Sequence, residues 1–113
     1  LGFQLIITTD HGTINVTSPI EIIGKKDTSS NLRYKYGKGL KFPQKKVFEI
    51  TDPVNYQLPK YSHDDKYVFA FENNYFIYRN KFNEYAKHFM NSYQHGGVSL
   101  QEMLIPLVKL QPK

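Results

Sequence analysis

Residues 3–9 form a short, almost unbroken run of apolar and β-branched side chains, FQLIITT. A run of this length and composition is typical of a strand that is buried on both faces in an α/β sheet. It ends directly at Asp10, His11 and Gly12. Open α/β sheets present ligand-binding groups at the carboxyl ends of their strands, so this position is where functional side chains are expected.

Two further segments are predicted to form strands, and two more are predicted to form a β-hairpin. Residues 14–23 alternate loosely and contain Pro19, which favours an edge strand or a bulged hairpin arm. From residue 25 to 59 the chain is rich in Lys, Gly, Pro, Asn and Ser, and only residues 46–50 resemble a strand. The aromatic, alternating runs 67–71 and 75–79 are separated by three polar residues, which predicts a β-hairpin.

The C-terminal third predicts two helices and a last strand. Aromatic and apolar residues recur every three or four positions from Lys81 to Tyr93, so we expect an amphipathic helix with Asn80 as its N-cap. Ser99 and Glu102 have the spacing of a capping box, which predicts a short helix ending near Pro106. Residues 107–110 would form the last strand. The fold class predicted is therefore α/β.

Composition limits what kind of protein this can be. The chain has 113 residues, which allows one compact domain, and no apolar run approaches the roughly 20 residues that span a bilayer. We therefore expect a protein without a membrane partner, with the cytoplasm as the default location. Cysteine is absent, so a transition metal would need His, Asp or Glu ligands. Because a strand begins so close to the first residue, we expect the chain to be part of a longer protein.

The positive charge is concentrated in one segment. The net charge is +5, yet residues 25–46 contain eight basic residues and only one acidic residue, Asp27. The basic residues are Lys25, Lys26, Arg33, Lys35, Lys38, Lys41, Lys45 and Lys46. This segment could contact phosphate groups, nucleic acid or an acidic partner, or it could be a solvated loop. Within it, Arg33 is predicted to bind the anion, because a guanidinium grips phosphate oxygens in a bidentate fork; the alternative is a surface salt bridge.

Three positions carry side chains suited to a metal ion. Asp10 and His11 combine a carboxylate with an imidazole, and Gly12 would allow the sharp turn that aims both at one ion. His95 precedes two glycines at the junction of the two predicted helices. Each position also has a structural explanation, as a turn, a cap or a helix stop. His63 lies beside two aspartates in a polar loop and is predicted to be exposed.

Taken together, three stretches resemble the C-terminal part of the PglZ domain, a branch of the alkaline phosphatase superfamily. They are IITTDHG at residues 6–12, NLRYK at 31–35 and QHGGVSLQEMLIP at 94–106. The resemblance covers residues 3–113 and implies the C-terminal portion of an alkaline phosphatase-like sheet with flanking helices and an aromatic hairpin. It implies two zinc ions, with Asp10 and His11 on one and His95 on the other. It also places the nucleophilic Thr or Ser and the remaining ligands upstream of this chain.

The resemblance implies a zinc-dependent phosphatase or phosphodiesterase domain that acts on a phosphoester, as the output domain of a response regulator behind a receiver domain. We expect the chain alone to be inactive and to bind zinc weakly, because it lacks the nucleophile and most of the ligands. Its partners would be the N-terminal part of the same domain, the receiver, or a second copy in a homodimer or segment-swapped oligomer. The alternative functions are a non-catalytic module that binds nucleic acid or an acidic partner through residues 25–46, and an output domain that signals by dimerisation.

Overall fold

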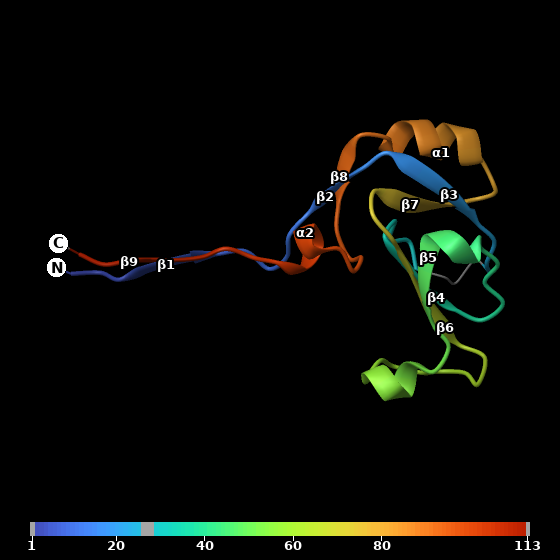
Figure 1. The fold of residues 1–113 in the computed structure, drawn as a ribbon, viewed down its shortest axis with the longest axis horizontal. Coiled ribbons are helices and arrows are strands. Elements are labelled where there is room, and N and C mark those ends of the chain that lie inside the picture. Colours follow the sequence, from blue (N-terminus) through green and yellow to red (C-terminus); the bar gives the residue numbers. More distant parts are fainter. Residues whose placement is uncertain (1, 26–28, 113) are drawn as a thin grey trace.

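The computed structural model describes residues 2–25 and 29–112, and this part of the chain contains nine strands and a few short helices (Figure 1). The strands are β1 Leu5–Thr8, β2 Ile14–Val16, β3 Ser18–Ile22, β4 Tyr34–Gly37, β5 Val47–Ile50, β6 Lys66–Ala70, β7 Asn74–Tyr78, β8 Ser92–Gln94 and β9 Leu107–Leu110. The α-helices are α1 Phe82–Phe89 and α2 Leu100–Met103, and short 3₁₀ helices cover Gln44–Lys46 and Pro53–Tyr56. This mixture is consistent with the expected α/β class, whereas the wider alkaline phosphatase-like sheet stays a prediction.

The strands form four small sheets. β3 pairs with β7 in parallel, and β6 lies between β4 and β5 in an antiparallel sheet of three strands. Because β3 pairs only with β7 in the described part of the chain, Pro19 lies on an edge strand, as predicted. β2 pairs with β8, and β1 pairs with β9, both antiparallel.

β7 is the strand that is buried on both faces. Phe76 packs in one apolar cluster with Ile20 and Val68, between the β3–β7 pair and the three-stranded sheet. Tyr75 and Ile77 point the other way, into a second cluster under α1. The core therefore has two layers that meet at β7, and α1 covers the outer one (Figure 1).

The predicted hairpin of residues 67–79 is wrong, although both of its strands exist. The main chain of Leu32 and Arg33 runs between β6 and β7: Ala70 N–H donates to Arg33 O at 2.8 Å, and Phe76 N–H donates to Leu32 O at 2.7 Å. β6 and β7 therefore do not pair, and each joins a different sheet. The chain still turns tightly, with Asn74 N–H donating to Phe71 O at 3.0 Å.

The prediction that residues 3–9 form a strand buried on both faces is also wrong. β1 is exposed along its whole length, because β9 is its one partner in the described structure and no layer packs on the pair. β1 and β9 instead form a two-stranded ribbon that extends away from the rest of the molecule (Figure 1). The predicted last strand, residues 107–110, is confirmed.

The long helix predicted over residues 81–93 is shorter than expected. α1 ends at Phe89, and residues 92–94 form β8 instead. Asn91 turns the chain with φ of 62° and donates its N–H to Val16 O at 2.8 Å, which starts the pairing with β2. The N-cap is Lys81, at φ of 58°, rather than Asn80. In the described residues, no helix has the length and apolar character needed to cross a membrane.

Candidate functional site

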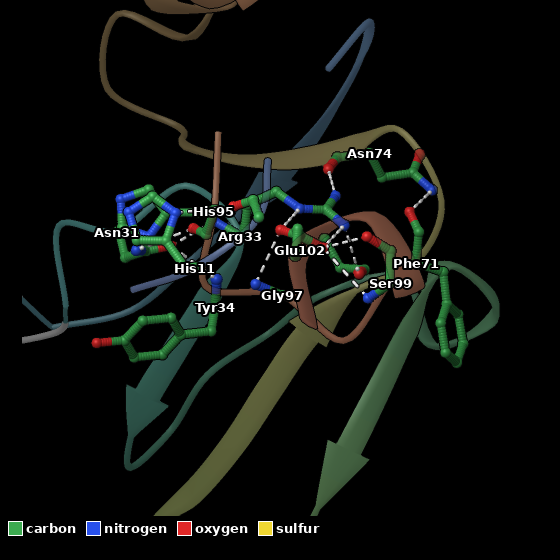
Figure 2. A network of polar contacts seen from close by, with 12 residues as sticks. His11, Asn31, Arg33, Tyr34, Phe71, Asn74, His95, Gly97, Ser99 and Glu102 are labelled. Carbon is green, nitrogen blue, oxygen red and sulfur yellow. Dashed lines mark hydrogen bonds and ion pairs between the residues drawn. The ribbon is translucent and has the colours of Figure 1, made fainter. Parts of the chain in front are cut away.

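The structure brings together two of the three predicted metal ligands. His11 follows β1 and His95 follows β8, and the antiparallel pairing of Ile14 with Gln94 places these segments side by side. The two imidazole rings stack with centroids 3.6 Å apart and an interplanar angle of 9° (Figure 2). Residues far apart in sequence thus form one polar site at the junction between the ribbon and the body.

Asp10 lies beside His11 at the edge of this site. Its Oδ1 is 3.6 Å from His11 Nε2, and its side chain is 87% exposed. His11 Nδ1 lies 2.8 Å from Gly12 O. A carbonyl oxygen only accepts hydrogen bonds, so Nδ1 carries a hydrogen and donates it. In neutral His11 the lone pair is then on Nε2, which faces the Asp10 carboxylate and is the atom available to a cation.

The donors fit zinc in kind but not in number. Imidazole nitrogen and carboxylate oxygen are ordinary zinc ligands, and the tautomer of His11 leaves one lone pair free. In the part of the chain that the structure describes, however, no group of three or more His, Cys, Asp or Glu residues is arranged to hold an ion. These residues therefore form part of a metal site at most, and their role as ligands stays a prediction.

Glu102 connects the two histidine segments. Its carbonyl oxygen accepts a hydrogen bond from Gly12 N–H at 2.8 Å, one residue after His11. Its carboxylate Oε1 accepts one from Gly97 N–H at 2.9 Å, two residues after His95. Asn31 adds a third tie, because its side-chain N–H donates to His95 O at 3.3 Å. One residue of α2 thus fixes both loops from which the imidazoles project (Figure 2).

Arg33 is the buried partner of Glu102. Its Nε and one terminal nitrogen donate to the two Glu102 oxygens, at 2.7 and 2.9 Å, and its side chain is fully buried. Its remaining contacts are with the carbonyl oxygens of Asn74 and Ala70. The bidentate fork expected of Arg33 therefore exists, but the anion it holds here is the carboxylate of Glu102. Direct binding of a substrate phosphate by Arg33 stays a prediction. In this structure the guanidinium of Arg33 connects Glu102 to two main-chain carbonyl oxygens.

Glu102 is held in its charged form. Burial alone would raise the pKa of its carboxyl, but hydrogen bonds from Arg33, Ser99 and Gly97 outweigh it and lower the pKa below its ordinary value of 4.5. The hydroxyl and the N–H of Ser99 both donate to Oε2, at 2.5 and 3.2 Å. The predicted capping box of α2 is thus confirmed, and its glutamate also neutralises Arg33.

Two glycines of the motifs are required by close packing. A Cβ at Gly12 would lie 1.9 Å from the main-chain oxygen of Gln101, so only glycine lets α2 approach this segment. A Cβ at Gly97 would lie 2.7 Å from Glu102 Oε2 and 2.9 Å from an Arg33 nitrogen. Gly12 does not have a positive φ. Its presence is therefore explained by space beside α2 rather than by the sharp turn that was expected.

The basic segment is only partly at the surface. Arg33 and Lys35 are buried, whereas Lys38, Lys41, Lys45 and Lys46 are exposed. Lys26 and Asp27 lie outside the described residues. Buried Arg33 and Lys35 are not presented to a partner at the surface, and binding of nucleic acid or an acidic partner by residues 25–46 stays a prediction. His63 is exposed beside Asp64, as predicted.

Sequence reasoning missed Glu102 as a residue of the site. Its spacing from Ser99 indicated a capping role, and that role accounted for it fully. Glu102 and Arg33 are 69 residues apart, and no local pattern pairs residues at such a separation. The available signal was the basic residue itself, because Arg33 directly follows Leu32 and stands next to a strand, where a buried arginine requires an acidic partner.

Comparison with known proteins identifies the family. A search of curated proteins finds no significant match. One family model, described as the BREX system PglZ alkaline phosphatase-like domain, matches residues 1–110. The match includes both histidine motifs and the whole Glu102 network. The chain therefore belongs to the family of PglZ alkaline phosphatase-like domains.

Proposed function

We propose that this chain supplies one side of the active site of a zinc-dependent phosphatase or phosphodiesterase, as the output domain of a response regulator. Asp10 and His11 would bind one zinc ion and His95 a second. The observation that carries the proposal is the contact between His11 and His95, whose ring centroids are 3.6 Å apart although 83 residues separate them in sequence. Membership of an alkaline phosphatase-like family supports the reaction class.

The chain's own residues would position ligands and hold their protonation states. The Gly12 carbonyl keeps the hydrogen of His11 on Nδ1, so that Nε2 can donate its lone pair. Glu102 and Arg33 hold the loops of both histidines from behind. Bound zinc would supply Lewis-acid stabilisation of phosphoryl oxygens and activation of a hydroxyl nucleophile, which the family resemblance places upstream of this chain.

The test uses a protein that carries this chain behind the upstream half of the domain. His11→Ala and His95→Ala should each lower bound zinc, measured by elemental analysis, and should lower kcat/KM for bis(p-nitrophenyl) phosphate by more than about 100-fold. His63→Ala is the matched control, because His63 is an exposed histidine beside an aspartate. Unchanged zinc content and turnover in both site variants would overturn the proposal.

The isolated chain provides a second measurement. We expect it to hydrolyse no phosphodiester, because the nucleophile and most ligands are assigned to the upstream half. Turnover by the purified chain that a chelator abolishes would show that the nucleophile lies within these residues.

A further inference from the structure

A cavity of about 900 Å³ lies on the side of the molecule between β7, α1 and the segment before β4. Its walls are largely apolar and aromatic. They include Ile22, Leu32, Phe76, Tyr78, Tyr85 and Phe89. A volume in this range can hold a small organic molecule, and flat aromatic walls favour a ligand with a flat apolar body.

The charged side chains among the described lining residues of the cavity are all cationic. Lys25, Lys35 and Arg79 line it, and no Asp or Glu is among its described lining residues. His95 also lines it, so the cavity reaches one of the two stacked histidines. Arg79 is already paired with Glu21 through two hydrogen bonds of 3.1 and 2.9 Å. Lys25 is exposed, which leaves Lys35 as the buried cation of the cavity.

Lys35 is buried without an ionic partner in the described part of the chain. Its side chain is 1% exposed, its Nζ donates to Ser29 O at 2.6 Å, and Nζ lies 4.5 Å from the centroid of the Tyr78 ring. No described carboxylate lies within ion-pair distance of it. Burial lowers the pKa of Lys35 to about 8, so it still carries its charge at neutral pH. A buried ammonium of this kind is unfavourable unless something compensates its charge.

We propose that this cavity is a binding site for an organic anion with a flat apolar body, and that Lys35 binds the anionic group. The aromatic walls would hold the body of the ligand, and the charge of Lys35 would select an anion over a neutral molecule of the same shape. The proposal requires neither zinc nor turnover, so it stands or falls separately from the proposed hydrolase function.

The probe is 1-naphthalenesulfonate, whose charge is constant across the neutral range, compared with neutral 1-naphthalenemethanol and with inorganic sulfate. We expect calorimetric titration of the chain to show tighter binding of the sulfonate than of either comparison compound. Lys35→Met should weaken sulfonate binding by about 10-fold or more, since a hydrogen bond to a charged group is lost. Lys45→Met, at an exposed lysine, should leave the affinity unchanged.

Two checks keep the test decisive. Tyr85→Ala, in the wall of the cavity at a partly exposed position, should also weaken the sulfonate, and circular dichroism should show that each variant is folded. Amide chemical shifts should move at Lys35 and Tyr78 and not at Ile7 in the exposed ribbon. Equal affinity of folded Lys35→Met, equal binding of the neutral compound or of sulfate, or shifts confined to the ribbon would each overturn the proposal.

Discussion

Glu102 shows how one residue can serve the structure in several ways at once. Its side chain completes a capping box, neutralises Arg33 and accepts the Gly97 N–H, while its carbonyl accepts the Gly12 N–H. A buried ion pair is not by itself strong evidence of stabilisation, because both ions lose their hydration. The loss of one partner is different, since it leaves the other charge buried and uncompensated.

We predict that Glu102→Gln lowers the free energy of unfolding by about 3 kcal/mol, because Arg33 keeps its charge in a fully buried place. Urea denaturation at pH 7 measures this. Glu49→Gln breaks a comparable but partly exposed pair, with Lys66 at 2.7 Å, and should lower it by less than about 1 kcal/mol. Equal effects of the two variants would show that burial of the Arg33–Glu102 pair does not raise the cost of breaking it.

The same carboxyl makes the wild-type chain sensitive to acid. The folded pKa of Glu102 lies below its ordinary value of 4.5, so the unfolded chain binds the proton more readily. The stability that Glu102 contributes is therefore present above pH 4.5 and is lost as the pH falls from there through the folded pKa. Urea denaturation between pH 6 and pH 3 should show that the free energy of unfolding falls more steeply for the wild type than for Glu102→Gln. Parallel curves of the free energy against pH would contradict this.

Lys35 should give a pH dependence of the same sign as Glu102, but in a different pH range. Its pKa falls from 10.5 in the unfolded chain to about 8 in the folded one, so the unfolded chain binds more protons between these values. Stability therefore rises with pH in this window. From about pH 7.5 to 9.5 we expect a gain of about 2 kcal/mol in the wild type relative to Lys35→Met, measured by urea denaturation. A constant difference between the two proteins would contradict the lowered pKa.

At the scale of elements, local patterns predicted where strands and helices lie better than how they pair. Alternation placed β6 and β7 correctly, and the Ser99–Glu102 spacing placed α2. Their pairing depends on the Leu32–Arg33 main chain, which comes from elsewhere in the sequence and separates β6 from β7. The helix predicted from periodicity also continued beyond Phe89, where α1 ends. A local pattern contains no information about the competing pairing of β8 with β2.

In the candidate site, too, residues in local motifs were predicted from the sequence, whereas long-range contacts were not. His11 and His95 were found because each belongs to a short contiguous motif, and their contact agrees with the predicted proximity. Arg33 was found by its chemistry, yet its partner Glu102 was not, since a long-range ion pair leaves no local trace. The cavity beside Lys35 has no sequence motif either, because its walls come from several separate elements.

The turn between β6 and β7 contains a strained residue that can be tested. Glu72 has φ of 47°, a left-handed conformation that disfavours residues with a Cβ. Glu72→Gly should therefore raise the free energy of unfolding by up to about 1 kcal/mol. Asn83→Gly, at an exposed position within α1, should lower it by a similar amount. Thermal unfolding followed by circular dichroism compares them, and destabilisation by both would contradict the strain at Glu72.

At the scale of the whole molecule, the ribbon gives the chain an unusual shape. The radius of gyration is 17.4 Å and the longest dimension is 57 Å, whereas a compact domain of this size has a radius near 13 Å. The difference comes from β1 and β9, which project beyond the body (Figure 1). Antiparallel partners share a face, so Leu5, Ile7, Val108 and Leu110 lie together on one side of the ribbon. The other side carries Ile6, Thr8, Leu107 and Lys109.

The entirely apolar side of the ribbon predicts self-association of the isolated chain. All four of its residues are exposed, and each outer edge of the ribbon leaves main-chain donors and acceptors for a further strand. We expect sedimentation velocity to show a mass above that of the monomer that increases with concentration. Ile7→Lys should shift the chain toward monomer, because it places a charge in the apolar face. Ile6→Lys, one residue away on the side that already carries Lys109, should do so much less.

A protein that also carries the upstream half of the domain should lose this association, because we expect that half to cover the ribbon. Monomeric wild-type chain at high concentration would mean that the apolar side is not an interface between copies.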